Sequence, residues 1–288
     1  MLDANTFSNS NVINFIQENF IAFKINAETK IGKNLFEQYK GTGYPLIVFI
    51  DNNNNELDRF YGYYSPDNFI SKLKNIDSGI NTFPDLLAKY KLGDQSAETM
   101  FNLAIKATDR GNDSLAKILY SNVIKHKNVS LDMFHRSHLA LGIQSLKNDD
   151  LLLINYLNIY PESPLLKDAV NYLLNYYYMK GLIQQELDLY NKYIDQFKND
   201  YLFLNQYSWR MTELETNLDK ALDMINLSIK IFKGDAKQKA MILDTKAEIL
   251  WKQNLHNDAI IIINESIELD SENQYYINQK KKFLESIN

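Results

Sequence analysis

The sequence predicts two regions of different fold: a small α/β region at residues 1–77 and an all-α region of repeated helix pairs at 96–288, with a helical linker at 78–95. The strand and hairpin patterns lie in the first region, no strand signal remains from about Pro84 onward, and turn residues recur regularly after residue 96. The chain has 288 residues, close to the length of two average domains. Its 10 glycines and 5 prolines favour long helices over a turn-rich β fold.

The composition excludes several classes of function. With 31 basic and 36 acidic residues the net charge is −5, so a broad electrostatic attraction to nucleic acid is not expected. The chain has no cysteine, which excludes disulfides, thiolate metal sites and a cysteine nucleophile among these residues. No run of about 20 apolar residues is present, so no transmembrane segment is expected.

The first region begins with a helix and a strand. Residues 11–18 carry Val12, Phe15 and Ile16 at helical spacing, which predicts one apolar helix face. Phe20–Asn26 follows as a short strand. Gly32–Lys40 has the pattern of a second helix, which ends at the glycines of 41–43.

A hairpin and a third helix complete this region. Pro45–Ile50 is a continuous apolar run, typical of a strand buried on both faces. Asp51–Asn55 is a turn, and Glu56–Tyr63 is the second strand of the hairpin. Ser65, Pro66 and Asp67 then open a helix with a hydroxyl cap, a proline in the first turn and an acid near the positive end.

These elements carry a resemblance to a known family. Thr6–Ser8, Asn19–Glu28, Gly43–Asp51 and Arg59–Tyr63, in this order, resemble the body of a thioredoxin-family domain. The resemblance implies that the Tyr44–Pro45 bond is cis and that Gly43, Tyr44 and Pro45 form a loop that receives the backbone of a client protein. The alternative is an ordinary trans proline at the start of a strand. With the whole block present, the cis form is expected.

The chain departs from this family at the redox motif. The resemblance places the Cys-x-x-Cys helix and a central strand, between 20–26 and 45–50, just upstream of Met1. Two explanations are open: an N-terminally truncated domain, in which Met1 is not the true start, or a degenerate cysteine-free relative. We favour truncation, because loss of a central strand exposes unpaired backbone edges.

The second region has the period of a helical repeat. Turn residues at Gly111, Asn148, Gly181, Thr216 and Asn254 are separated by 33–38 residues. The last repeat places small residues at Ala247, Ala259 and Ser266, where two helices would pack closely. This pattern resembles the tetratricopeptide repeat (TPR), with two antiparallel helices in about 34 residues. The expected fold is therefore a partial α/β thioredoxin-like domain followed by an all-α TPR superhelix with a C-terminal capping helix at 274–287. The alternative is an irregular helical bundle.

A TPR superhelix has a concave groove lined by the first helix of each repeat. Alignment on the five turn residues predicts a mixed polar and aromatic lining, and protein or peptide clients as partners. The groove residues are Phe101, His135, His138, Asn171, Asn175, Phe203, Gln206, Arg210, Asp244 and Trp251, together with Glu98, Asp168 and Met241.

The other groups of polar residues in the sequence indicate no specific catalytic or metal-binding chemistry. His135 and His138 lie three residues apart, as two metal ligands on a helix could, but no third ligand is evident and an ordinary pair of groove or core histidines is preferred. The sequence has no Gly-x-Ser-x-Gly elbow and no phosphate-binding glycine loop. No metal or cofactor is expected. Lys280–Lys282 is expected to be a solvated helix end.

Two functions remain open at this stage. In the first, the complete parent performs thiol-disulfide exchange or assists folding of protein clients, and this cysteine-free chain only binds them. In the second, the chain is a non-catalytic TPR adaptor with a degenerate thioredoxin-like domain. Residues 1–5 lack the basic start and apolar core of a signal peptide, whereas complete relatives are often exported to the periplasm, so the compartment and the oligomeric state stay undetermined.

Overall fold

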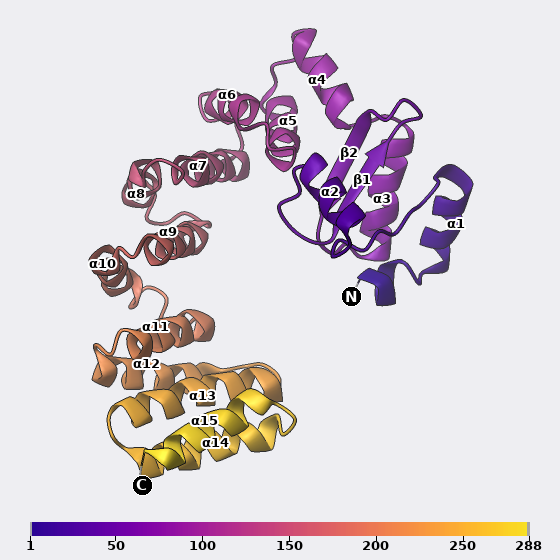
Figure 1. Cartoon of the computed structure of the whole chain (residues 1–288). Helices are drawn as coiled ribbons and strands as arrows, with labels where there is room; N and C mark the ends of the chain where they lie inside the picture. Colours follow the sequence, from indigo (N-terminus) through magenta and orange to yellow (C-terminus); the bar gives the residue numbers. More distant parts are fainter. Residues whose placement is uncertain (1, 287–288) are drawn as a thin grey trace. The chain divides into compact units, whose positions relative to one another are not determined.

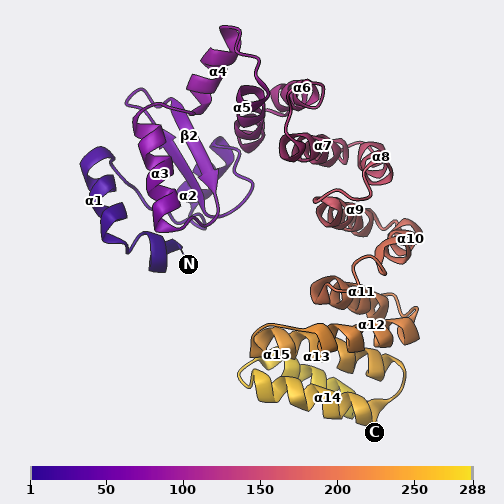
Figure 2. The same cartoon turned by 180° about the vertical axis from the view of Figure 1, so that it is seen from behind.

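The computed structural model describes residues 2–286 and divides into two compact units, Met1–Ala169 and Val170–Asn288, each considered by itself. Figures 1 and 2 show its elements from opposite sides. Two predictions fall on residues outside the described range: that Met1 is not the true start, and that the capping helix ends at 287. No helix within the described part of the chain is both long and apolar enough to span a bilayer.

The first unit begins with the α/β region that the sequence predicts. Its elements are a π-helical turn at Leu2–Thr6, α1 (Ser10–Asn19), α2 (Lys30–Gln38), β1 (Leu46–Ile50), β2 (Glu56–Tyr61) and α3 (Pro66–Asp77). The two strands form an antiparallel hairpin in which Leu46 pairs with Tyr61 and Ile47 with Phe60. Phe60 and Val12 share one buried cluster with the apolar face of α3, so α1 and α3 pack on the hairpin.

Three local predictions are wrong. Phe20–Asn26 is not a strand: it has no partner strand among the described residues, and Ile21 and Phe23 are 87% and 82% exposed. A strand needs a neighbour for its backbone N–H and C=O groups, and none lies beside this segment. For the same reason β1 is half-buried rather than buried on both faces. Ser65 occupies the N-cap position of α3, but its side chain makes no capping hydrogen bond.

The predicted linker at 78–95 is a packed helix. Here α4 (Phe83–Lys91) places Leu86 in one buried cluster with residues of α5 (Ala97–Asp109) and α6 (Asp113–Val123). The unit continues with α7 (Leu131–Ser145) and α8 (Leu151–Ile159). The boundary between the two compact units follows Ala169, within the helical region, and is distinct from the predicted end of the α/β region at 77, which stays a prediction.

The hairpin is joined to α5 by charged side chains. Lys106 forms an ion pair with Asp58, and Arg110 pairs with Glu56 at 3.0 Å. The carbonyl of Asp109, at the end of α5, accepts hydrogen bonds from Arg59 at 3.1 Å and from the Tyr61 hydroxyl at 3.3 Å. These contacts satisfy a carbonyl at a helix C-terminus, where no intrahelical donor is available. The α/β region and the first helix pair therefore pack as one body.

The second unit consists of helices in antiparallel pairs. It contains most of α9 (Leu166–Lys180), then α10 (Ile183–Tyr193), α11 (Tyr201–Glu213), α12 (Leu218–Ile231), α13 (Ala236–Lys252), α14 (His256–Leu269) and α15 (Gln274–Glu285). Ala247, Ala259 and Ser266 are fully buried, as expected for small residues where α13 and α14 approach each other. The helix α15 covers this last pair through Tyr276 and Phe283.

The predicted turn residues all lie between the helices of a pair. Gly111, Gly181 and Asn254 adopt positive φ angles of 64°, 66° and 62°, a conformation that suits glycine and asparagine at the end of a helix. Asn148 and Thr216 lie in the corresponding connections. The predicted fold class, a thioredoxin-like α/β region followed by TPR-type helix pairs, is confirmed.

Candidate peptide-binding surface

The first helices of successive pairs lie next to one another in the second unit. Helix α11 packs on α13. The guanidinium of Arg210 on α11 lies 4.7 Å from the centre of the Tyr178 ring on α9, a cation–π contact. The helices α9, α11 and α13 therefore form one layer, and we examined the polar groups that this layer carries.

Four polar side chains of this layer have a buried oxygen without a hydrogen-bond partner: Asn171 on α9, Asn205 and Tyr207 on α11, and Asp244 on α13. In three of them, Asn171, Asn205 and Asp244, the oxygen is an Oδ1 acceptor. A buried acceptor without a donor costs about 1–3 kcal/mol. Native structures keep few such groups, so one on the first helix of each of three successive pairs requires an explanation.

The three residues occupy the same place in their repeats. Each lies three residues before a buried residue: Leu174 after Asn171, Ser208 after Asn205, and Ala247 after Asp244. The sequence prediction found Asn171 and Asp244 but selected Gln206 in place of Asn205. The connection between α11 and α12 is one residue longer than the connection between α13 and α14, and it contains two residues with positive φ, Glu215 and Asn217. Counting back from Thr216 therefore selects the residue that follows Asn205. Counting from Ser208 would have found Asn205.

A buried ion pair fixes Arg210. Its guanidinium donates to both carboxylate oxygens of Glu186, at 2.8 and 2.9 Å, and also to Glu213 at 3.0 Å. Glu186 is 2% exposed, at a place where the sequence pattern called for a small residue. Since both Arg210 and the Tyr178 ring are held, they form a rigid cationic and aromatic part of the layer.

Asp244 lies among the charged groups that join α13 to α15. The carboxylate of Glu248 accepts hydrogen bonds from Gln279 at 3.1 Å and from Lys282 at 2.5 Å. Burial, and then the nearby charge of Glu248, raise the pKa of Asp244 to about 7. Lys282 is thus held in an ion pair with Glu248, whereas Lys281 is solvated as predicted for this helix end, with 76% of its side chain exposed.

The remaining predicted groove residues of the second unit have different surroundings. Asn175 and Gln206 are exposed. Phe203 is only 1% exposed and belongs to the core, so it does not line a surface. Trp251 stacks on Phe283 of α15, with ring centres 5.7 Å apart. Asp168 lies in α9 and Met241, 37% exposed, lies on α13.

The predicted groove residues of the first unit lie on α5 and α7. Phe101 is 4% exposed and is part of the core around α5 and α6, and Glu98 is in the first turn of α5. The Nδ1 of His135 lies 3.1 Å from the Tyr156 hydroxyl, and the His138 ring stacks on Tyr156. Burial, and then the nearby His135, lower the pKa of His138. The pair is therefore part of an aromatic cluster.

No metal site is assembled around these histidines. Across residues 2–286, no group of three or more His, Cys, Asp or Glu side chains is placed to hold a metal ion.

The predicted client-binding loop of the α/β region is at Gly43, Tyr44 and Pro45. The Tyr44–Pro45 peptide bond is cis, as predicted. Tyr44 is 63% exposed, and its ring stacks on Phe36 of α2 with a centre-to-centre distance of 4.4 Å. The carbonyl of Pro45 accepts a hydrogen bond from the Gly62 amide at 3.0 Å. The role of this loop in client binding stays a prediction.

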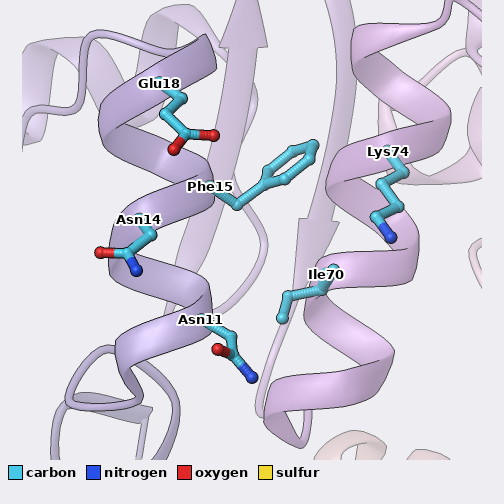
Figure 3. A pocket seen from close by; sticks show the side chains of 6 residues that line it. All are labelled: Asn11, Asn14, Phe15, Glu18, Ile70 and Lys74. Carbon is cyan, nitrogen blue, oxygen red and sulfur yellow. The ribbon is translucent and has the colours of Figure 1, made fainter.

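A second feature of this region is a cavity of about 310 Å³ between α1 and α3. Figure 3 shows Phe15 and Ile70 facing each other across it, with Glu18 and Lys74 on opposite helices. Asn11 and Asn14 complete the lining. Because this lining brings together no set of reactive groups, we assign it no chemistry.

Comparisons with known proteins found one family match and a similar solved structure. Residues 1–77 match the model of a family described as a thioredoxin-like domain. No curated protein matches the chain. Among solved structures, one described as "YrrB: a TPR protein with an unusual peptide-binding site" has a TM-score of 0.46 and 11% identity; the match covers 68% of this chain and 97% of that one. The N-terminal 77 residues are thus thioredoxin-like by sequence, and TPR-type helix pairs follow them in the structure.

Proposed function

We propose that this chain binds extended segments of protein clients along the first helices of its repeats, without thiol chemistry of its own. The observation that carries this proposal is the set of unpartnered oxygens of Asn171, Asn205 and Asp244. Because these oxygens are buried, the half-buried Asn171 and Asn205 side chains would turn outward to accept the backbone N–H groups that an extended polypeptide offers along its length. Arg210 and Tyr178 would add contacts to acidic and aromatic side chains of a client.

The test compares binding of an unfolded polypeptide, reduced and carboxymethylated α-lactalbumin, to the full chain and to variants. We expect the double variant Asn171→Ala/Asn205→Ala to bind it at least tenfold more weakly, with unchanged helix content. The matched control is Asn226→Ala, on the exposed face of α12, which should bind as the unchanged chain does. Equal binding by the double variant and the control would overturn the proposal.

A second candidate function is thiol-disulfide exchange in a complete parent that supplies a Cys-x-x-Cys motif. The match of residues 1–77 to thioredoxin-like domains favours it. The described chain contributes binding only, because without cysteine it forms no thiolate that could attack a disulfide. In an insulin-reduction assay with dithiothreitol, turbidity should therefore develop at the rate of the protein-free blank. A faster rate would contradict a binding-only role for these residues.

A further inference from the structure

The first unit contains a cavity of about 460 Å³ where the hairpin and α3 face α5. Its volume is in the range of small-molecule sites. Aromatic rings of Phe60, Tyr61 and Tyr64 form part of its wall, with Ile76 and Ile105 as further apolar contacts. The cavity lies on elements of one compact unit and is separate from the first-helix layer of the second unit.

One cation in this wall has no anionic partner. Among the residues that the structure describes, Lys106 is paired with Asp58 and Arg59 with Glu56, whereas Lys72 has no carboxylate within 4.0 Å. The Lys72 ammonium instead lies 4.7 Å from the Tyr64 ring centre and 5.4 Å from that of Phe60. Burial, and then the neighbouring Lys106, lower the pKa of Lys72, against the opposing effect of the more distant Asp58 and Asp109 carboxylates.

Three carboxamides lie near this cation with free hydrogen-bonding capacity. The side chains of Asn75, Asn81 and Asn102 line the cavity, and none makes a side-chain hydrogen bond within residues 2–286. Each carboxamide carries two N–H donors. The wall thus offers one unpaired ammonium and several neutral donors, a combination suited to oxygen atoms of an anion.

The charge of the wall selects a monoanion. The lining residues and their ion-pair partners Glu56 and Arg110 carry four positive charges (Arg59, Lys72, Lys106, Arg110) and three negative ones (Glu56, Asp58, Asp109), which leaves a single positive charge. A dianion such as a phosphate monoester would bring a second negative charge beside Asp58 and Asp109, and no second unpaired cation is there to neutralise it. The apolar part of the wall suits a hydrocarbon or aromatic body.

We propose that this cavity binds a monocarboxylate with an aromatic or branched apolar body, its carboxylate on Lys72 and the asparagine amides. The bound molecule would contact β2, α3 and α5 together, and so would stabilise the junction between the α/β region and the first repeat. This proposal does not depend on client binding by the second unit. The carboxylate could belong to a free acid or to the C-terminus of a peptide, which share this chemistry.

The test uses 3-phenylpropionate and its neutral amide, titrated into the isotope-labelled chain and followed by NMR. We expect the acid to bind at least tenfold more tightly than the amide, with shifts at residues of β2, α3 and α5. Phenyl phosphate should bind more weakly than the acid. Equal binding of acid and amide, tighter binding of phenyl phosphate, shifts elsewhere or no binding would each overturn the proposal.

Two lysine variants on α3 distinguish a direct contact with the Lys72 ammonium from a general effect of charge on binding. Lys72→Met keeps the length of the side chain and should weaken binding of the acid at least tenfold, whereas Lys74→Met, on α3 but outside this cavity, should change it less than twofold. A folded Lys72→Met variant that still binds would contradict the proposal. If that variant does not fold, the comparison of acid and amide on the unchanged chain decides. A pentapeptide ending in phenylalanine, as free acid and as amide, shows whether peptide C-termini are accepted.

Discussion

The Arg210 guanidinium holds the Glu186 carboxylate through two parallel hydrogen bonds of 2.8 and 2.9 Å, and so ties α11 to α10. Glu186 is nearly enclosed, with 2% of its surface exposed. At this point of a TPR-type pair a small residue would let the helices pack without charge. Here a buried acid occupies this position, and an arginine of the next pair neutralises it.

Removal of this arginine should destabilise the second unit. In Arg210→Ala the Glu186 carboxylate is left buried without its bidentate partner, and we expect a loss of about 3 kcal/mol in the free energy of unfolding. Urea unfolding followed by circular dichroism measures it. Arg136→Ala is the control, because its pair with Asp132 is exposed and should contribute less than about 0.5 kcal/mol. Similar losses in both variants would contradict the importance of burial.

The buried carboxyl of Asp244 should make stability depend on pH. Its pKa is about 7 in the folded chain against the ordinary 3.8 of an aspartate, so the folded state binds more protons between these pH values. Stability contributed by the protonated form is therefore present below about pH 4 and is lost as pH rises towards 7. The facing groups Glu248, Gln279, Tyr275 and Lys282 modulate this effect.

Asp244→Asn should remove this dependence, since the carboxamide has no charge to bury. We expect this variant to be more stable than the unchanged chain at pH 8, by at least about 1 kcal/mol, and to show a flatter stability profile between pH 4 and 8. Thermal unfolding across this pH range tests it. Asp223→Asn, exposed on α12, should leave the profile unchanged. A profile of Asp244→Asn parallel to that of the unchanged chain would refute the assignment.

Trp251 should matter for the attachment of α15. Its ring stacks on Phe283, and its Nε1 donates to the Ser286 hydroxyl at 2.9 Å. Because the ring is only partly buried, Trp251→Ala should cost about 2 kcal/mol, less than the 3–5 kcal/mol of a fully buried ring. Trp251→Phe keeps the stacking and should lose less than about 1 kcal/mol. An unchanged melting temperature of the alanine variant would contradict this packing role.

Hydrogen exchange should distinguish the segment after α1 from the repeat cores. Backbone amides at 20–26 have no sheet partner and their side chains are mostly exposed, so we expect them to exchange in the fastest class. Amides of buried α13 residues such as Ile242 and Ile249 should exchange slower by orders of magnitude. Mass spectrometry of peptic fragments measures both regions. Equal protection would show that 20–26 is ordered by contacts other than a sheet.

Much of the architecture follows from local patterns in the sequence. The hairpin was predictable because a β-branched run, an asparagine-rich turn and a second strand adjoin one another. The helix pairs were predictable because residues such as Gly111 and Gly181 mark each turn. The strand expected at 20–26 could not be tested locally, since a strand depends on a partner elsewhere in space.

The candidate site was less accessible to sequence reasoning. Asn171 and Asp244 were found by counting from turn residues, but one longer connection displaced the prediction from Asn205 to Gln206. Phe101 and Phe203 were taken as groove residues although their rings pack inward. Lys72 was not singled out, because its unpaired charge is apparent only when Lys106 and Arg59 are seen with their partners.

The ion pairs between the hairpin and α5 bear on how this chain can be divided. Residues 1–77 match a domain family, yet Asp58 and Arg59, which are 5% and 4% exposed, take partners from Lys106 and Asp109 beyond that limit. A fragment that stopped at Asp77 would leave the buried Asp58 carboxylate without Lys106 and Arg110, and Arg59 without the Asp109 carbonyl. The shortest N-terminal fragment able to fold should therefore extend through α6, to about Val123. The segment that matches the domain family, residues 1–77, is thus shorter than the segment expected to fold cooperatively.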